Sequence, residues 1–202
     1  MPTRPTIGLA LSGGAARGLA HIGVLRALSE NNIPVDYIAG TSAGSLVGGA
    51  WAAGMPLDKI EDIGMKLRWR DIGRMTMSRL GVQSNARLED YLRSTLPVAR
   101  FEELPIPFAV VATDLHSGQP VVMRDRGDVP FAIRASCAIP GLYIPVTDDA
   151  GRQLVDGARR GTAVDMAQRQ WPSGRPDSTS HARIVRSSLE EMSRRPSAEI
   201  RR

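Results

Sequence analysis

The 202-residue chain has 42% hydrophobic and 23% charged residues, which is ordinary for a soluble globular protein and excludes a wholly disordered one. No apolar run approaches the roughly 18 residues of a membrane span, and the one near the N-terminus is too short for a signal-peptide core, so we expect a cytoplasmic protein. The net charge of +5 lies within residues 157–202, where ten arginines stand against five acidic residues without the interleaved aromatic residues of a specific nucleic-acid binder.

The chain begins with a strand, a turn and a helix, and then repeats this unit. Residues 6–11 are predicted as a short apolar strand that stops at glycines, and residues 17–32 as a helix, because apolar side chains recur at three-residue spacings. Residues 35–39 are predicted as a second buried strand and residues 44–54 as a helix of small and apolar residues. This alternation predicts an α/β protein with a parallel sheet and flanking helices.

The middle of the chain, residues 55–104, is charged, favours helices and is interrupted by glycines. We predict that it lies over the functional site as a lid or forms a side layer. The rest of the ordered chain is predicted to hold two strands, a helix that ends at Pro140 and a last strand, at residues 105–115, 119–124, 128–146 and 152–157 in turn.

Ser42 lies in the pentapeptide GTSAG, between the second predicted strand and its helix. In a G-x-S-x-G turn the serine sits at a sharp, strained junction of strand and helix, where only small neighbours fit. Its Oγ is then exposed at a helix N-terminus, whose dipole favours developing negative charge. We therefore predict a nucleophile elbow formed by Gly40, Thr41, Ala43 and Gly44 around Ser42.

A second glycine cluster, SGGAARG at residues 12–18, follows the first strand. Its successive backbone N–H groups could form an anion-binding nest, which in a hydrolase would hold an oxyanion. The alternative is a nucleotide phosphate loop. No lysine followed by serine or threonine closes the cluster, however, and its spacing is not G-x-G-x-x-G.

A nucleophilic serine needs a base, and the sequence offers two kinds. His21, His116 and His181 lie in a helix, a turn and the basic tail, and each is read as a surface or core residue. Asp156 ends the last strand and is followed by glycine, so its carboxylate could reach the hydroxyl directly, with a turn aspartate as the alternative. The single cysteine, Cys137, excludes an internal disulfide and is read as a buried structural thiol.

Five segments stand in a recognisable order along the chain: LALSGGAARGLAHIGVLRAL, GTSAGSLVGGAWAAG, PFAVVATDLHSGQPVV, AIRASCAIPGLYIPV and LVDGA. Together they resemble the bacterial branch of the patatin-like phospholipases, which is similar to plant patatin and neuropathy target esterase. The resemblance covers residues 6–156. It implies a three-layer α/β/α sandwich with a mainly parallel central sheet, a Ser-Asp dyad without histidine, and hydrolysis of phospholipid or lysophospholipid acyl esters.

Carried onto this chain, the resemblance makes Ser42 the nucleophile and Asp156 the base. The oxyanion hole would be formed by the backbone N–H groups of Gly13, Gly14 and Ala15. The family usually has a third glycine where Ala15 stands, so a positive φ there would be strained.

Arg17 is a candidate for contact with a head-group phosphate, with a helix-surface arginine as the alternative. No metal-ligand spacing is present, and the resemblance implies no cofactor. The implied partner is a phospholipid or lysophospholipid, met by peripheral contact with the inner face of the membrane.

Residues 157–202 depart from the family pattern. We expect a patatin-like catalytic domain over residues 6–156, incomplete at its C-terminal end, followed by an atypical basic tail, rich in Arg, Ser and Pro, that is disordered and leaves one sheet edge exposed. The hypothesis is a truncated or frame-shifted family member. Two other functions stay open: a catalytically degenerate fold acting as a binding module, and a tail that binds nucleic acid or anionic membrane.

Overall fold

The computed structural model describes residues 4, 6–68, 73–78, 80–157 and 183–187. Its main feature is a seven-stranded sheet with the order β10-β1-β2-β5-β9-β8, with β6 paired to β5 off this path. The strands are β1 (Ile7–Leu11), β2 (Tyr37–Thr41), β5 (Phe108–Asp114), β6 (Pro120–Arg124), β8 (Val146–Thr147), β9 (Gln153–Asp156) and β10 (Arg183–Ser187).

The sheet is mixed, because its two halves are connected differently. β10, β1, β2 and β5 run parallel, as the alternation of strand and helix predicts. β6, β9 and β8 pair antiparallel. A short turn joins β5 to β6, and only antiparallel strands can be joined in that way. The mainly parallel sheet predicted from the sequence is therefore limited to the N-terminal half and the β10 edge.

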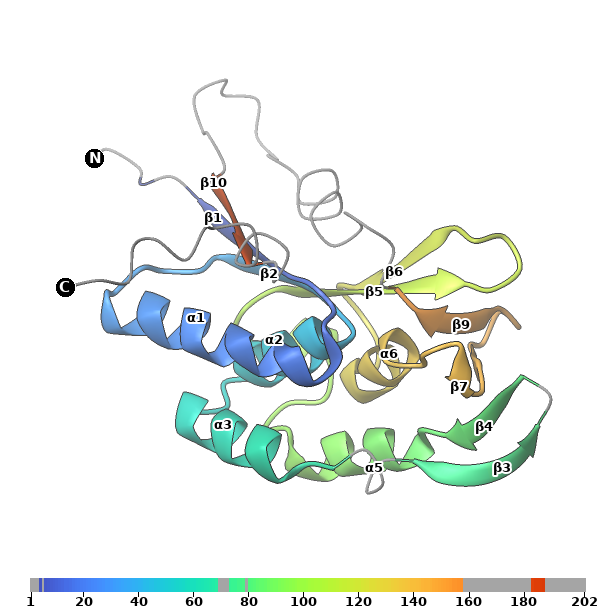
Figure 1. The fold of residues 1–202 in the computed structure, drawn as a ribbon. Helices are drawn as coiled ribbons and strands as arrows, with labels where there is room; N and C mark the ends of the chain where they lie inside the picture. The colour runs from blue at the N-terminus through green and yellow to red at the C-terminus, as the bar shows by residue number, and fades with distance from the viewer. Residues whose placement is uncertain (1–3, 5, 69–72, 79, 158–182, 188–202) are drawn as a thin grey trace, which may run out of the picture.

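One face of the sheet carries the described helices. Both α1 (Ala20–Glu30) and α2 (Ala43–Ala52) belong to crossovers that step in the same direction along the sheet. Right-handed crossovers that step in one direction place their helices on the same face. Figure 1 shows α1, α2 and α6 (Val129–Ser136) together below the sheet. α6 is shorter than predicted: its N-cap Asp128 accepts from the Phe131 N–H, and it ends before Pro140.

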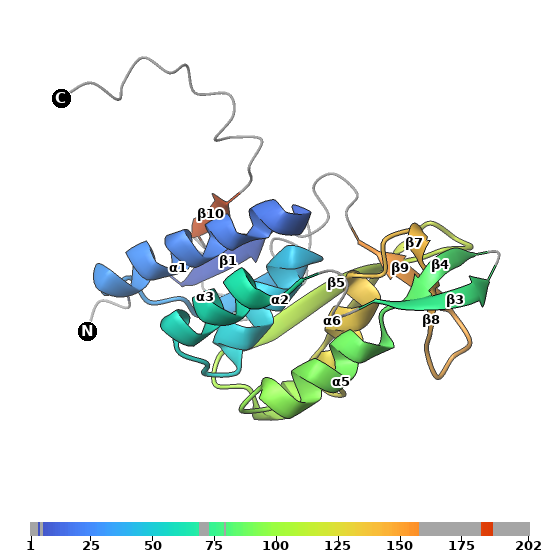
Figure 2. The ribbon, with the colours of Figure 1, turned by 60° about the horizontal axis from the view of Figure 1, so that its bottom comes forward.

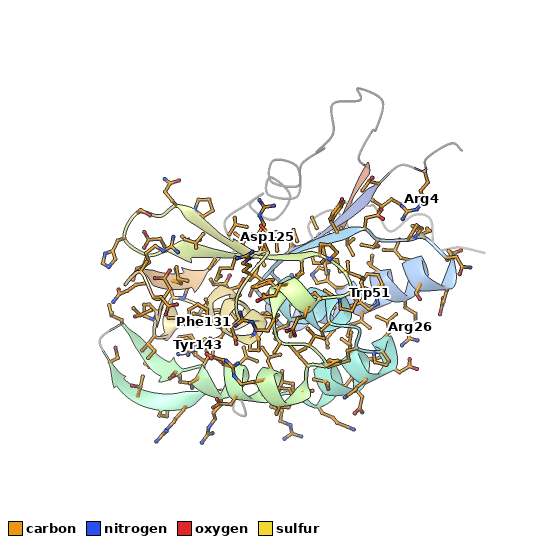
Figure 3. The ribbon with its side chains drawn as sticks, turned by 180° about the vertical axis from the view of Figure 1, so that it is seen from behind. Arg4, Arg26, Trp51, Asp125, Phe131 and Tyr143 are labelled. Atoms are coloured by element: carbon orange, nitrogen blue, oxygen red, sulfur yellow. The ribbon has the colours of Figure 1, made fainter. Side chains whose placement is uncertain are left out.

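The segment predicted as a lid or side layer forms a second layer on these helices (Figure 2). It contains α3 (Leu57–Lys66) and α5 (Ala86–Thr95), separated by a hairpin of β3 (Arg74–Ser78) and β4 (Gly81–Ser84). β4 pairs with β7 (Gly141–Tyr143), so the hairpin is part of a small second sheet that the sequence analysis did not predict. Ion pairs from Arg26 of α1, labelled in Figure 3, to Asp58 and Glu61 join the two helical layers.

The buried side chains form two clusters. The larger lies between β1, β2, β5 and the two helical layers. The smaller lies around α6, β7 and β9, where Tyr143 is buried and Phe131 packs against the cluster from its edge (Figure 3). The first cluster includes Ile38 of β2 and Val47 of α2, and the second includes Leu154 of β9. β2 and β9 therefore both pack against buried apolar side chains.

The C-terminal tail differs from the prediction in one respect. Residues 183–187 form β10, which pairs in parallel with the whole of β1. Among the described strands β1 is therefore not an edge strand, and the disorder expected of the tail does not extend to residues 183–187. The remainder of the predicted disordered tail, apart from Gly157, lies outside the described residues. Within the part of the chain that is described, no helix has the length and apolar character needed to cross a membrane.

Candidate active site

Ser42 occupies the junction between β2 and α2, as a nucleophile elbow requires. β2 ends at Thr41 and α2 begins at Ala43, and Ser42 between them has φ 52° and ψ −124°. A positive φ is uncommon for a residue with a side chain, and it persists only where the surroundings hold it. Ser42 is 7% exposed, so the strained residue is packed on most sides.

The elbow needs glycine at two positions because other backbone segments pass close to it. A Cβ at Gly40 would lie 2.7 Å from the Gly44 carbonyl oxygen. One at Gly44 would lie 2.7 Å from the Ser12 carbonyl oxygen, at the end of β1. Real Cβ atoms do not approach backbone so closely, so α2 could not start here with larger residues. Ala43 packs against Gly18, and Thr41 is buried with no hydrogen-bond partner for its hydroxyl among the described residues.

The Ser42 hydroxyl donates a hydrogen bond to the Asp156 carboxylate, with 2.7 Å between Oγ and Oδ2. The sheet explains how two residues 114 positions apart meet. β6 takes one edge of β5, so β2 and β9 must share the other edge. β2 ends where Thr41 pairs with Val111, and β9 runs toward it and ends where Asp156 pairs with Ala112. The two strand ends therefore converge at consecutive residues of β5.

The surroundings of Asp156 keep the end of β9 in place. Its N–H donates to the carbonyl oxygen of Ala138 at 2.9 Å. The next residue must be small, because a Cβ at Gly157 would meet the Val111 carbonyl oxygen. Cys137 is buried nearby, and both burial and the negative charge of Asp156 raise the pKa of its thiol. A protonated, buried thiol agrees with the structural role predicted for it.

The glycine cluster forms the turn between β1 and the short 3-10 helix η1 (Ala15–Leu19). Ala15 has φ 47°, the strained value anticipated for an alanine in this place. No hydrogen bond within the described residues takes the N–H groups of Gly13, Gly14 or Ala15. The N–H of Ser42, in contrast, donates to Ser136 Oγ at 2.8 Å. Consecutive N–H groups of this turn are therefore available to bind an anion near the serine, unlike the N–H of Ser42 itself.

Neither histidine that the structure describes bonds to the Ser42 hydroxyl, which donates to a carboxylate instead. His21 is buried in α1, where its Nε2 lies 2.8 Å from the Ser12 carbonyl oxygen, and burial lowers its pKa. It therefore braces the end of β1 just before the glycine turn. His116 is exposed in the turn after β5, and His181 lies outside the described residues. The sequence did not predict that His21 stabilises the end of β1, because this role depends on its burial and on its hydrogen bond to Ser12.

An apolar cavity of about 180 Å³ begins at Ser42 and extends between the two helical layers. Small residues of the glycine turn and α2 form one wall, and apolar side chains of α3 and α5 form the other. Residues on its lining include Ala15, Ser42, Val47, Ile63, Leu88 and Leu92. The Arg17 side chain is exposed and does not line the cavity. In the described residues no cluster of three or more His, Cys, Asp or Glu side chains could hold a metal ion.

Comparison of the sequence with known proteins identifies a family for this chain. The family model for patatin-like phospholipase matches residues 9–167. An NTE family protein of Mycobacterium tuberculosis is 43% identical over 156 residues, which are 76% of this chain and 42% of that protein. The lysophospholipase NTE1 of Mycosarcoma maydis is 33% identical over 160 residues, 75% of this chain and 8% of that one.

Among solved structures, VipD from Legionella pneumophila has a similar fold, with a TM-score of 0.60 and 14% identity. The match covers 78% of this chain and 46% of VipD. This likeness confirms the predicted α/β sandwich class. The chain spans about two fifths of the mycobacterial relatives that it matches. On the family model and these relatives, the chain belongs to the patatin-like phospholipase family.

Proposed function

We propose that this chain is a serine lipid acyl hydrolase in which Ser42 is the nucleophile and Asp156 is the general base. The observation that carries the proposal is the 2.7 Å hydrogen bond from Ser42 Oγ to Asp156 Oδ2. A serine hydroxyl becomes nucleophilic when an adjacent base can accept its proton, and a carboxylate in a largely dry site is a better base than one in water. The proposed catalytic region is residues 6–156.

The reaction would proceed by two acyl transfers. Asp156 accepts the hydroxyl proton while Ser42 Oγ attacks the ester carbonyl carbon, and the oxyanion that forms is bound by the N–H groups of Gly13, Gly14 and Ala15. The protonated Asp156 then donates to the departing alcohol oxygen, which leaves an acyl-enzyme. Water, deprotonated by the same carboxylate, releases the fatty acid. Each lost oxyanion donor costs about a hundredfold to a thousandfold in turnover.

The proposed substrate is the acyl ester of a phospholipid or lysophospholipid. The cavity that starts at Ser42 is lined mainly by apolar side chains along α2, α3 and α5, which suits a hydrocarbon chain. An ester carbonyl at Ser42 would place its acyl chain in the cavity and its head group toward the surface. Arg17, exposed on η1, is the proposed contact for the head-group phosphate.

Such a substrate lies in a lipid surface, and we propose a cytoplasmic protein that reaches the inner face of the membrane by peripheral contact. The outer layer carries several apolar side chains that are exposed: Met65 on α3, and Met75, Leu80 and Val82 on the hairpin. These would enter the interfacial region of a bilayer. Replacement of Met75 and Val82 by serine should lower the fraction of protein that floats with anionic vesicles. Unchanged flotation would exclude this surface.

The test of the proposed activity is labelling of the 202-residue chain with a fluorophosphonate probe, with fatty-acid release from lysophospholipid measured in parallel. The expected result is labelling and release by the unchanged chain, and neither by Ser42→Ala. Absence of labelling in a chain with a folded far-ultraviolet spectrum would reject catalysis and favour the binding-module alternative. Binding of nucleic acid or anionic membrane that depends steeply on salt and is lost on deletion of residues 157–202 would favour the tail-mediated alternative.

A further inference from the structure

Ser136, in the last turn of α6, is a completely buried hydroxyl that lies against the backbone of Ser42. Its Oγ accepts a hydrogen bond from the Ser42 N–H at 2.8 Å, across 94 positions of sequence. The same Oγ donates to the carbonyl oxygen of Val111 in β5 at 2.6 Å. One side chain thus satisfies two backbone groups that belong to different elements.

The first bond acts on the strained residue itself. The Ser42 carbonyl oxygen is held by the start of α2, since it accepts from the N–H groups of Ser45 and Leu46 and from the Ser45 hydroxyl. The Ser42 N–H has Ser136 as its partner. Strained backbone persists only when the surroundings over-determine it, and Ser136 supplies the restraint on the N-terminal side of Ser42.

The second bond acts on the point where β2 and β9 converge. Val111 pairs with Thr41, the residue before the nucleophile. Its carbonyl oxygen is also the atom that a Cβ at Gly157 would strike. Ser136 therefore ties the peptide of Ser42 to the strand against which the end of β9, with Asp156, is packed.

We propose that Ser136 is a positioning residue that sets the orientation of Ser42 toward Asp156, and that it removes the Ser42 N–H from the set of oxyanion donors. This inference rests on the proposed function of Ser42. Ser136 does not line the apolar cavity, so its loss should affect the reacting atoms and leave binding of the acyl chain alone.

The test compares Ser136→Ala with Ser45→Ala in the whole 202-residue chain. Both serines are completely buried and both contact Ser42. When the Ser45 hydroxyl is removed, however, the Ser42 carbonyl oxygen still accepts from the backbone N–H groups of residues 45 and 46. Ser136→Ala should lower kcat for an ester substrate about tenfold to a hundredfold, the range expected for misplaced reacting groups, with KM unchanged. Ser45→Ala should lower kcat less than threefold. Ser136→Cys replaces the hydroxyl by a thiol, which is a weaker donor and acceptor, and its kcat should lie between those of wild type and Ser136→Ala. This variant keeps the comparison possible if Ser136→Ala does not fold.

A readout that does not need activity is amide hydrogen exchange at Ser42, followed by NMR. The Ser42 amide should exchange at least tenfold faster in Ser136→Ala than in wild type and Ser45→Ala. The inference is overturned if kcat of Ser136→Ala stays within threefold of wild type, if both alanine variants lose kcat equally, or if the Ser42 amide keeps its protection. Should wild type itself show no turnover, the proposed function fails, and the exchange rates alone decide the role of Ser136.

Discussion

Ser42 and Asp156 meet because the strands that carry them end head to head along one edge of β5. β2 runs parallel to β5 and ends beside Val111, while β9 runs antiparallel and ends beside Ala112. The two side chains are thereby brought to 2.7 Å without a loop of their own to orient them. The contact depends on the lengths and directions of two strands. Small displacements of either strand end should therefore lower kcat of the proposed reaction.

Asp156→Asn removes the proton acceptor while leaving an oxygen that the Ser42 hydroxyl can still reach. General base catalysis contributes about 10²- to 10⁴-fold, so we expect kcat to fall by that factor with KM unchanged. Steady-state kinetics on a soluble ester would measure it. Asp114→Asn is the matched control, since Asp114 is a half-buried residue at the end of β5 whose carboxylate accepts from the His116 N–H and the Ser117 hydroxyl. Equal losses in the two variants would contradict the role of Asp156.

Gly157→Ala should displace the end of β9, because the added Cβ would meet the Val111 carbonyl oxygen. The expected result is a loss of at least about tenfold in kcat, the size of effect that misplaced reacting groups produce. Gly8→Ala is the control, because a Cβ at Gly8 in β1 meets nothing within 4 Å. A Gly157→Ala variant with full activity would show that the strand end tolerates the shift.

The local parts of this fold are predictable from sequence. The strand, turn and helix around Ser42 follow from an apolar run that meets small residues, since only such residues allow the close approach of Gly40 and Gly44 to neighbouring backbone. The positive φ of Ala15 agrees with the resemblance, because the family usually has a third glycine of the turn at this position. In both cases the constraint acts over a few residues and leaves a mark in composition.

The long-range parts are not predictable in that way. The direction of β9 decides whether Asp156 points at Ser42, and it depends on how the chain returns from α6. Ser136 lies in an unremarkable helical stretch, and only its contacts across the sheet reveal its role. β10 was missed because its sequence lies in a basic, polar tail, and pairing with β1 is a tertiary interaction that overrides the local composition.

Ala15→Gly should relieve strain in the glycine turn. A left-handed backbone costs alanine about 1–2 kcal/mol, while glycine adds roughly 0.5–1 kcal/mol of conformational entropy to the unfolded chain. We expect the free energy of unfolding to rise by up to about 1 kcal/mol in urea denaturation, with kcat retained because the backbone N–H remains. Ala15→Val should destabilise, since a β-branched residue is strained at φ 47°. Ala16→Val, one residue along without a positive φ, should be close to neutral.

His21 should make folding stability depend on pH. Burial lowers its pKa in the folded state, so the unfolded chain binds the proton more readily. The contribution of neutral His21 to the free energy of unfolding is therefore fully present above about pH 6.5, the ordinary pKa of histidine. It decreases as the pH falls below that value, by at most about 1.4 kcal/mol per pH unit. Urea denaturation between pH 7.5 and 5.5 would show this decrease. His21→Gln keeps a donor for the Ser12 carbonyl oxygen, and its free energy of unfolding should not show this decrease. If wild type and His21→Gln show the same pH dependence, the decrease comes from another group.

Val47→Phe should shorten the acyl chain that the cavity accepts. Val47 lies on α2, five positions after Ser42, and is 8% exposed on the cavity wall. Each methylene removed from an apolar site loses about 0.8 kcal/mol, close to a fourfold change in affinity, so kcat/KM for long-chain esters should fall at least tenfold while that for acetyl esters changes little. Val24→Phe on α1, packed against the core away from this cavity, controls for overpacking. A uniform loss across all chain lengths would mean that Val47 supports the fold and does not contact the acyl chain.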